Sequence, residues 1–366
     1  MKIKNNMFLF LIIAVLVFLL MHTMVIFWFC QNTPGLVYNT FTKMLPLILT
    51  AGYITLYALS RKINFWPLES FLLTYLGALF LAFCVIFAFV SISLLLKIFH
   101  ITLPNNLGFW ILGTWIIIFL ISLYTAAKAP KITYINFETP HIKQDIKIAF
   151  ISDTHFGATV GLKRAKSLKQ IIEKNKPDLI VFGGDVFETD FKDGTPFAEI
   201  IAEILPNKKF GVFGNHEYYQ GLDNAKLSFN KAGIKLLENK SENIDNINII
   251  GINDIRTAHI SKQEFENILK QQVKPHSFNL LLTHTPMYFE EAAKLGINLM
   301  LSGHNHNGQI WPFSFLVRMT NPYLYGHFKS GQANLFVTSG TFFWGPPVRF
   351  LTNNEVVFIN LKGERE

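Results

Sequence analysis

Charged residues are scarce in this sequence. Of its 366 residues, 16% are Asp, Glu, Lys or Arg, whereas 50% are hydrophobic and 36 are phenylalanine. Charged residues make up about a quarter of an ordinary soluble domain, so part of this protein is predicted to lie in lipid. The shortage is concentrated between Met7 and Ala127, and the remainder has the charge content of a soluble domain. Two structural units are therefore expected to meet near residue 130.

Cysteine is almost absent as well. Cys30 and Cys84 both lie in the hydrophobic half, and nothing in the sequence resembles a disulfide framework. We expect two buried free thiols, with a single disulfide as the open alternative. The net charge of +8 suits an anionic membrane surface or an anionic substrate. Because no basic stripe with interleaved aromatics is present, no nucleic-acid partner is expected.

The first hydrophobic run is long enough to cross a membrane. Met7 to Phe29 contains no charged residue, and about 20 apolar residues span a bilayer. The run is too long for a signal peptide, and the sequence CQNTPG that follows has no small-residue cleavage site, so we predict a retained helix. The second run is the weakest candidate because it contains Lys43 and Pro46. The four predicted spans are residues 7–29, 41–59, 68–96 and 107–127.

Charge placement predicts the orientation of these spans. One side would carry six basic residues, namely Lys2, Lys4, Arg61, Lys62, Lys128 and Lys131. The other side would carry only Lys43 and Lys97. The positive-inside rule then predicts a multi-pass protein of the inner membrane, with the C-terminal domain in the cytoplasm. If the second run were interfacial, three spans would put that domain outside.

Short apolar runs separated by amphipathic stretches begin at Ile132. Seven of them are predicted to be buried strands: Lys147–Ser152, Leu179–Phe182, Phe210–Phe213, Ile247–Ile252, Leu280–Leu282, Leu299–Leu301 and Leu335–Thr338. A helical periodicity lies between the first two runs, in residues 162–172. Strand, helix and strand in succession indicate the α/β class.

Chemically active side chains follow these strands. The motifs are DTH after the first strand, GGD after the second, GNHE after the third, TH after the fifth and GHNH after the sixth. Ligands of α/β sheets bind outside the carboxyl ends of strands. The sequence therefore predicts that all these side chains meet at one edge of one sheet.

Together these side chains form a plausible set of metal ligands. The predicted ligands are Asp153, His155, Asp185, Asn215, His284, His304 and His306. Taken alone, Asn215 could be a helix cap and His284 an ordinary loop residue. Seven oxygen and imidazole donors without a thiolate favour two divalent ions, with Mn²⁺, Mg²⁺, Fe²⁺ and Zn²⁺ as candidates. Two such ions would share a bridging carboxylate and clamp a phosphoryl oxygen.

The ordered motifs resemble those of the calcineurin-like metallophosphoesterases, over roughly Lys147 to Leu361. The resemblance implies a four-layer αββα sandwich, here preceded by a four-helix transmembrane region. The expected divisions are a transmembrane region over 1–130, a linker over 131–146 and a metallophosphoesterase domain over 147–366. Gly303–Pro312 and Thr338–Phe350 resemble the membrane-associated branch of this family. The usual last motif of that branch is closer to GHTHGGQ, so Asn305 and Asn307 depart from it and put only substrate contacts in doubt.

The same resemblance implies roles for the site residues. One ion would be held by Asp153, His155, Asp185 and His306. The other would be held by Asp185, Asn215, His284 and His304. His216 would contact the scissile phosphate and assist the leaving group, as a general acid does.

A membrane anchor favours a substrate that itself lies in the membrane. Length and layout also resemble a group of membrane-anchored UDP-2,3-diacylglucosamine pyrophosphatases of lipid A biosynthesis, whose products are UMP and the acylated sugar 1-phosphate. Mn²⁺ is the favoured ion. Lys163, Arg164 and Arg349 are candidate contacts to the diphosphate, and the apolar segments 311–325 and 342–350 either face lipid or belong to the core. The rival hypotheses are a membrane-bound phosphodiesterase or phosphatase with other substrates, and a non-catalytic scaffold. The sequence leaves the oligomeric state open.

Overall fold

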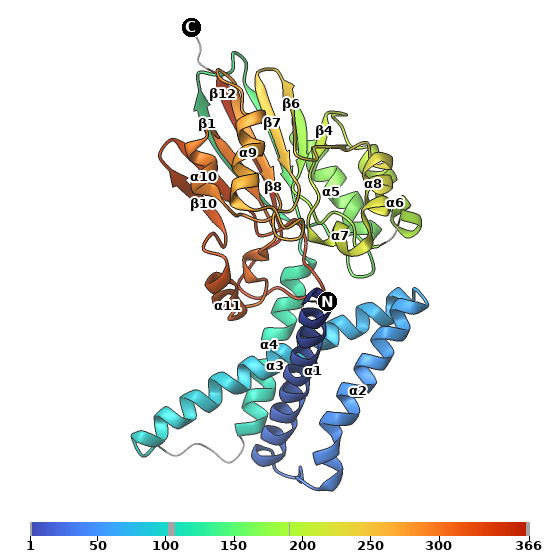
Figure 1. Ribbon diagram of the computed structural model, residues 1–366. Helices are drawn as coiled ribbons and strands as arrows, with labels where there is room; N and C mark the ends of the chain where they lie inside the picture. The colour runs from blue at the N-terminus through green and yellow to red at the C-terminus, as the bar shows by residue number, and fades with distance from the viewer. Residues whose placement is uncertain (1, 102–106, 190, 364–366) are drawn as a thin grey trace. The chain divides into compact units, whose positions relative to one another are not determined.

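A computed structural model describes residues 2–101, 107–189 and 191–363 of the protein (Figure 1). The chain divides into two units. The first comprises the N-terminal helices through Tyr124 together with Gly345–Val348, and the second comprises Thr125–Trp344 and the residues from Arg349 onward.

Four long helices make up most of the first unit: α1 (Lys2–Asn32), α2 (Thr40–Lys62), α3 (Trp66–Ile98) and α4 (Leu107–Ala127). All four are long and apolar enough to cross a membrane. The first three extend a few residues beyond the predicted limits, and the additional residues of α1 and α2 are mostly polar. α2 runs on through Pro46 and is capped by Asn39, whose side chain accepts from the amide of Thr42. The side chains of Lys2 and Lys4 lie outside the part of the chain whose side chains are described.

Buried polar contacts join three of these helices. His22 of α1 is 1% exposed, and its ring nitrogens lie 3.0 Å from the Thr50 hydroxyl on α2 and 2.6 Å from the Tyr75 hydroxyl on α3. Helices in lipid gain no hydrophobic free energy from associating, so close packing and hydrogen bonds between them carry more of the stability. This network therefore helps to hold α1, α2 and α3 together.

The second unit contains two six-stranded mixed sheets. The first has the order β1-β12-β2-β3-β4-β5, and the second has the order β10-β11-β9-β8-β7-β6. Strands of the first sheet are β1 (Lys131–Thr139), β2 (Ile146–Ile151), β3 (Leu179–Phe182), β4 (Lys209–Gly211), β5 (Lys235–Leu236) and β12 (Glu355–Gly363). Strands of the second are β6 (Lys240–Ile244), β7 (Ile247–Ile252), β8 (Phe278–Thr283), β9 (Leu299–Ser302), β10 (Gly326–Ser330) and β11 (Ala333–Val337). The strands that precede the active-site motifs, β2–β3–β4 and β8–β9, run parallel to their neighbours within each group.

Helices cover the outer faces of both sheets, so the unit has the predicted four-layer αββα architecture. α5 (Leu162–Asn175), α6 (Phe191–Ala202) and α8 (Leu222–Lys231) lie beside the first sheet, and α9 (Lys262–Gln272) and α10 (Phe289–Lys294) cover the second (Figure 1). The remaining short helices are α7 (Asn215–Gln220), the 3-10 turn η1 (His306–Gly308) and α11 (Phe313–Thr320).

The core between the sheets explains the continuous apolar runs. Ile148 and Phe150 of β2 pack in one cluster with Leu280 and Leu282 of β8. The alternate residues of these strands face the helices. On the second sheet, for example, Leu281 packs in a cluster with apolar residues of α9 and α10. Since both faces of the central strands are buried, these strands are hydrophobic at every position.

Two expectations about this unit need correction. The proposed linker contains β1, which pairs along its whole length with β12, so residues 131–139 are part of the sheet. The strands before the motifs also belong to two sheets and not to one. Each of the strands before the motifs can be predicted from its own residues. The strand with which it pairs depends on contacts between segments far apart in the sequence. The division at residue 130 and the remaining limits stay predictions.

Candidate metal centre and catalytic site

The loops that follow five strands bring the predicted ligands together. Asp153 and His155 follow β2, and Asp185 follows β3. Asn215 begins α7 after β4, so these residues all come from the first sheet. His284 follows β8, and the second sheet also supplies the ligands after β9, which are His304 and His306.

One group of donor atoms consists of Asp153, His155 and His306, which lie within 4.8 Å of one another. His155 Nε2 is 3.0 Å from His306 Nε2, and His306 Nε2 is 3.4 Å from Asp153 Oδ1. All three side chains are buried.

A second group consists of Asp185, His284 and His304, also within 4.8 Å. Asn215 joins it through its Oδ1, which lies 3.2 Å from His284 Nε2 and 2.9 Å from His304 Nδ1. Asp185 Oδ2 lies 3.1 Å from His284 Nε2 and 3.8 Å from His155 Nε2, so its carboxylate faces both groups. This is the position expected of a bridging ligand.

Hydrogen bonds behind the ligands orient their donor atoms. His284 Nδ1 donates to the carbonyl oxygen of Gly183 at 2.8 Å, which leaves Nε2 directed at Asp185. His155 Nδ1 donates to Glu188 at 2.5 Å, and the Ser152 hydroxyl donates to Asp153 Oδ2 at 2.7 Å. Such outer contacts fix the tautomer and the direction of a metal-binding side chain.

The backbone of the site is strained. Five of the seven predicted ligands have positive φ angles: Asp153 at 57°, His155 at 46°, Asp185 at 52°, His304 at 71° and His306 at 47°. Non-glycine residues seldom adopt this conformation, and clusters of such residues are typical of functional sites.

Two glycines let the motif loops approach one another closely. A Cβ atom added at Gly303 would lie 2.1 Å from Asp153 Oδ2, and one added at Gly214 would lie 2.1 Å from Asp185 Oδ1. Neither distance is possible for real atoms. The two buried carboxylates thus fit only where a side chain is absent.

The chemistry of the donor set fits divalent cations. Burial lowers the pKa of His304 to about 4, and burial with the charge of His155 keeps the pKa of His306 well below its usual range. Both rings are therefore neutral at physiological pH, and neutral imidazole is the metal-binding form. Burial and the charge of Asp185 raise the pKa of Asp153, although the charges of His284 and His155 oppose the rise.

Asp185 and His284 form a charged pair at the centre of the site. Despite burial, the charges of His284 and His216 lower the pKa of Asp185 well below its usual range. Despite burial, the charge of Asp185 raises the pKa of His284 well above its usual range. Because imidazole binds a metal ion in its neutral form, a cation held by Asp185 and His284 would displace the proton of His284.

His216 lies beside this site and is paired with Glu188. It belongs to neither of the two groups above, but with His155 and Glu188 it forms a third group whose donor atoms lie within 4.8 Å of one another, and its Nε2 is 3.9 Å from Asp185 Oδ2. Its Nδ1 lies 2.6 Å from Glu188 Oε1, the same oxygen that contacts His155. Burial lowers the pKa of His216, but the charge of Asp185 and the hydrogen bond to Glu188 outweigh it and raise the pKa to about 9. Bound divalent cations would oppose that rise.

Glu188 was missed by the sequence reasoning. Burial raises its pKa, but hydrogen bonds from His155 and His216 outweigh this effect and lower it to about 2, so the group is ionised. The available signal was its place three residues after Asp185 in GGDVFE. An acid in that loop could have been expected to face the same site.

The side chain of Glu217 links the GGD and GNHE loops by hydrogen bonds. It is fully buried and accepts from the amides of Asp185, Val186 and Gly214 at 2.9, 2.7 and 2.7 Å. Burial and the charge of Asp185 raise the pKa of Glu217 to about 7. The residue therefore has a structural function that connects the GGD and GNHE motifs.

The three basic residues proposed as diphosphate contacts have different positions. Arg349 is 0% exposed, and its Nη2 donates to the carbonyl oxygens of Ser339 and Phe342 at 2.7 and 2.6 Å. The same atom lies 3.2 Å from His306 Nδ1, so Arg349 supports a predicted ligand and is enclosed by the protein. Arg164 donates to the carbonyl oxygen of Ala126 at 3.0 Å, whereas Lys163 is exposed on α5.

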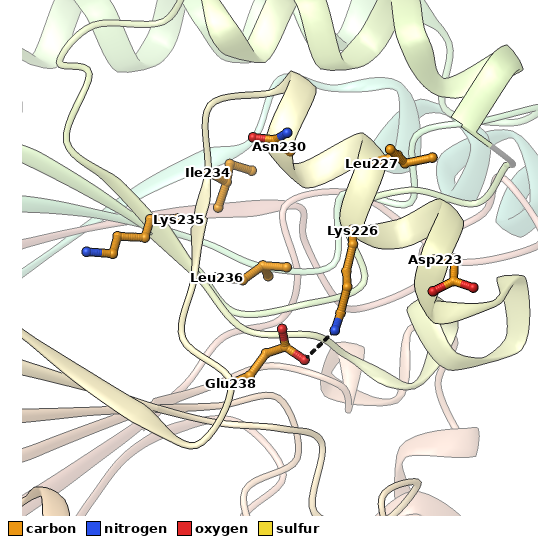
Figure 2. Close-up of a pocket in the computed structure, with 8 residues that line it drawn as sticks. All are labelled: Asp223, Lys226, Leu227, Asn230, Ile234, Lys235, Leu236 and Glu238. Atoms are coloured by element: carbon orange, nitrogen blue, oxygen red, sulfur yellow. Dashed lines mark ion pairs between the residues drawn. The ribbon is translucent and has the colours of Figure 1, made fainter.

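A separate hollow of about 630 Å³ lies between α8 and β5 (Figure 2). Acidic and basic side chains line this hollow, and two of them, Lys226 and Glu238, form an ion pair at 3.0 Å. Its lining contains no histidine and none of the predicted ligands. We therefore assign no catalytic or metal-binding function to this hollow.

Known proteins resemble this chain over the region that contains the site. The sequence profile of calcineurin-like phosphoesterases matches residues 146–308. A metallophosphoesterase of Campylobacter jejuni is 32% identical over 258 residues, which cover 68% of this chain and 68% of that protein. One from Aquifex aeolicus is 33% identical over 230 residues, which cover 60% of this chain and 86% of that protein. A transmembrane protein with metallophosphoesterase domain from Danio rerio is 26% identical over 259 residues, which cover 66% of this chain and 59% of that protein.

Proposed function

The chain belongs to the calcineurin-like metallophosphoesterase family and is a hydrolase with helices suited to a membrane, and from this we propose that it cleaves a lipid-linked phosphoanhydride. The observation that carries the proposal is the convergence of seven side chains that could hold metal ions, from two sheets, with His216 at their edge. A non-catalytic scaffold has no need of a paired histidine beside such a centre.

We assign one divalent ion to Asp153, His155, Asp185 and His306. We assign the second to Asp185, Asn215, His284 and His304. Mn²⁺ is the ion we favour, because oxygen and imidazole donors without thiolate suit it. Two ions so held would lower the pKa of a water molecule and would neutralise charge that develops on the phosphoryl oxygens.

The protein's own groups would handle the leaving group. His216 Nδ1 is held by Glu188, so its Nε2 is the atom free to face a substrate. The charge and hydrogen bond of Glu188 favour a proton on that ring, whereas bound cations would oppose the raised pKa of His216. His216 would then donate a hydrogen bond to the scissile phosphate and give the proton to the departing oxygen. Glu188 acts through His216 and is a positioning residue.

The substrate we favour is UDP-2,3-diacylglucosamine, cleaved to UMP and 2,3-diacylglucosamine 1-phosphate in lipid A biosynthesis. Four apolar helices give little advantage to an enzyme of soluble nucleotides, but they keep a catalytic domain beside a substrate in the membrane. The net charge of +8 suits an anionic headgroup. The placement of basic residues at the helix ends supports an inner-membrane protein whose catalytic domain faces the cytoplasm.

The test is Mn²⁺-dependent release of UMP from UDP-2,3-diacylglucosamine by the purified full chain in detergent. Wild type should release UMP, and Asp185→Ala should not. Hydrolysis of bis-p-nitrophenyl phosphate without UMP release would keep the phosphoesterase and overturn the substrate. No hydrolysis of either compound by metal-loaded protein would favour the scaffold.

A further inference from the structure

Helix α11 presents its apolar side chains outward. Phe315 is 59% exposed, Leu316 is 58% exposed and Met319 is 82% exposed. The side chains turned inward are Ser314, which packs against Gly308, and Val317. A surface helix of a soluble domain has the opposite arrangement, with apolar residues inward. An apolar face of this kind indicates an interaction surface.

The exposed surface of α11 continues into two neighbouring segments. Trp311 is 44% exposed, Trp344 is 51% exposed and Leu351 is 70% exposed. Hydrogen bonds link the segments that contain these residues. The amide of Trp311 donates to the carbonyl oxygen of Phe350 at 3.1 Å. The Gln309 side chain pairs with both main-chain groups of Trp344, at 2.8 and 2.9 Å. We name this surface the apolar rim; it consists of Trp311, Phe315, Leu316, Met319, Trp344 and Leu351.

Charge distinguishes the rim from an ordinary protein-binding surface. The sequence contains no Asp or Glu between Glu291 and Glu355, and the whole rim lies within this stretch. The charged residue within α11 is Arg318, in its last turn. Tryptophan, phenylalanine and arginine without acidic residues are typical of helices that lie in the interface of an anionic bilayer.

The rim is also tied to the point where the chain leaves the fourth apolar helix. Asn354, three residues after Leu351, donates to the carbonyl oxygens of Ala126 and Lys128 at 3.0 and 3.1 Å. α4 ends at Ala127. A surface connected to these residues through a single short segment lies near the membrane interface if α4 spans the membrane.

We propose that the apolar rim inserts into the interfacial layer of the bilayer in which the chain is anchored. The occupant of this surface is the headgroup and upper acyl-chain region of the lipids. Trp344 also contacts His216, with ring centroids 5.6 Å apart. Insertion would therefore hold the edge of the active site against the leaflet, and a lipid headgroup would reach His216 without leaving the membrane.

The experiment uses full-length protein in nanodiscs of phosphatidylethanolamine and phosphatidylglycerol, with both cysteines replaced by alanine. Met319→Cys carries an environment-sensitive fluorophore, and lipids carry a doxyl quencher either near the carbonyl group or near the chain end. The matched control is Lys235→Cys, an exposed position on β5. Because Met319 is mostly exposed, its substitution leaves the fold intact, and Leu316→Cys repeats the measurement one turn away.

At positions 319 and 316 we expect a blue-shifted emission that the shallow quencher reduces strongly and the deep quencher reduces less. The control should emit as in water and respond to neither. Water-like emission at 319 and 316 would overturn the proposal. A blue shift without quenching would also overturn it, because the rim would then be covered by protein, such as a second copy of the chain. None of these outcomes depends on the substrate, so they are distinct from failure of the proposed function.

Discussion

Glu188→Gln tests whether a single carboxylate controls both the metal site and the leaving-group histidine. His155 Nδ1 and His216 Nδ1 contact the same oxygen, Oε1, at 2.5 and 2.6 Å. Glutamine keeps one acceptor oxygen and the shape of the side chain but removes the charge. Each hydrogen bond to a charged group contributes about 1.5–3 kcal/mol. Loss of that contribution at His216 should reduce kcat/KM by about 10- to 150-fold, at about 1.4 kcal/mol per tenfold.

The same substitution has a pH signature. The charge and hydrogen bond of Glu188 stabilise protonated His216, so their loss must lower the pKa of His216. The fall of kcat/KM at high pH, where His216 loses its proton, should begin at a lower pH than in wild type. The effect through His155 appears separately, as metal affinity weakened by about 10- to 100-fold.

Hydrolysis of a phosphodiester with an alkoxide leaving group, which needs a proton to depart, is measured against pH at saturating Mn²⁺, and metal affinity is measured by calorimetric titration. The matched control is Glu203→Gln, the same change at an exposed carboxylate paired with Lys169. Control and wild type should agree. An unchanged kcat/KM and an unchanged high-pH limb in Glu188→Gln would refute the assigned role of Glu188.

Three further predictions address the remaining parts of the site. His216→Ala should leave metal affinity largely intact and lower turnover by about 10²-fold or more. The loss of turnover should be smaller for p-nitrophenyl esters, because their leaving group needs no proton. An equal loss for every leaving group would contradict proton donation by His216. Gly303→Ala should abolish metal binding and destabilise the domain by about 1–3 kcal/mol, because the added Cβ would overlap Asp153 and Ser152. Metal binding is measured by calorimetry and stability by denaturation. The control is Gly161→Ala, whose added Cβ would have no atom within 4 Å. Chelation should lower the unfolding midpoint of wild type, because bound ions at 100 times their Kd add about 2.7 kcal/mol, and should leave Asp185→Ala unchanged; equal shifts in both would place the bound metal elsewhere.

The sequence made much of this fold predictable because its local patterns are strong. Long apolar runs with few or no charged residues are typical of membrane-spanning helices, so the four apolar helices could be predicted with errors of a few residues at their ends. Strands buried on both faces, such as β2 and β8, are continuous apolar runs that need no partner to be recognised. Five strands were not predicted: β1, β5, β6, β10 and β12. β5 is only two residues long and β1 lies in the segment expected to be a linker, whereas β12 contains the buried apolar run 356–359 and could have been recognised from its own residues.

The list of predicted ligands also came from local patterns, namely polar residues placed directly after strands. What the tertiary structure decided is which of these side chains meet and what supports them. Two sheets, and not one, supply the donors, because the pairing of strands depends on contacts between distant segments. Glu188 touches both His155 and His216 only because the loops after β2, β3 and β4 converge.

Arg349 shows most clearly where sequence reasoning ends. An arginine near a phosphate site is expected to bind the phosphate, and nothing local in the sequence indicates otherwise. In the folded protein its guanidinium is fully buried behind His306 and donates to carbonyl oxygens of the loop that surrounds it. Residue types and their order determined the chemistry available to this protein. Burial depends on the packing of segments far apart in the chain, and it determined which groups face the substrate and which only support them.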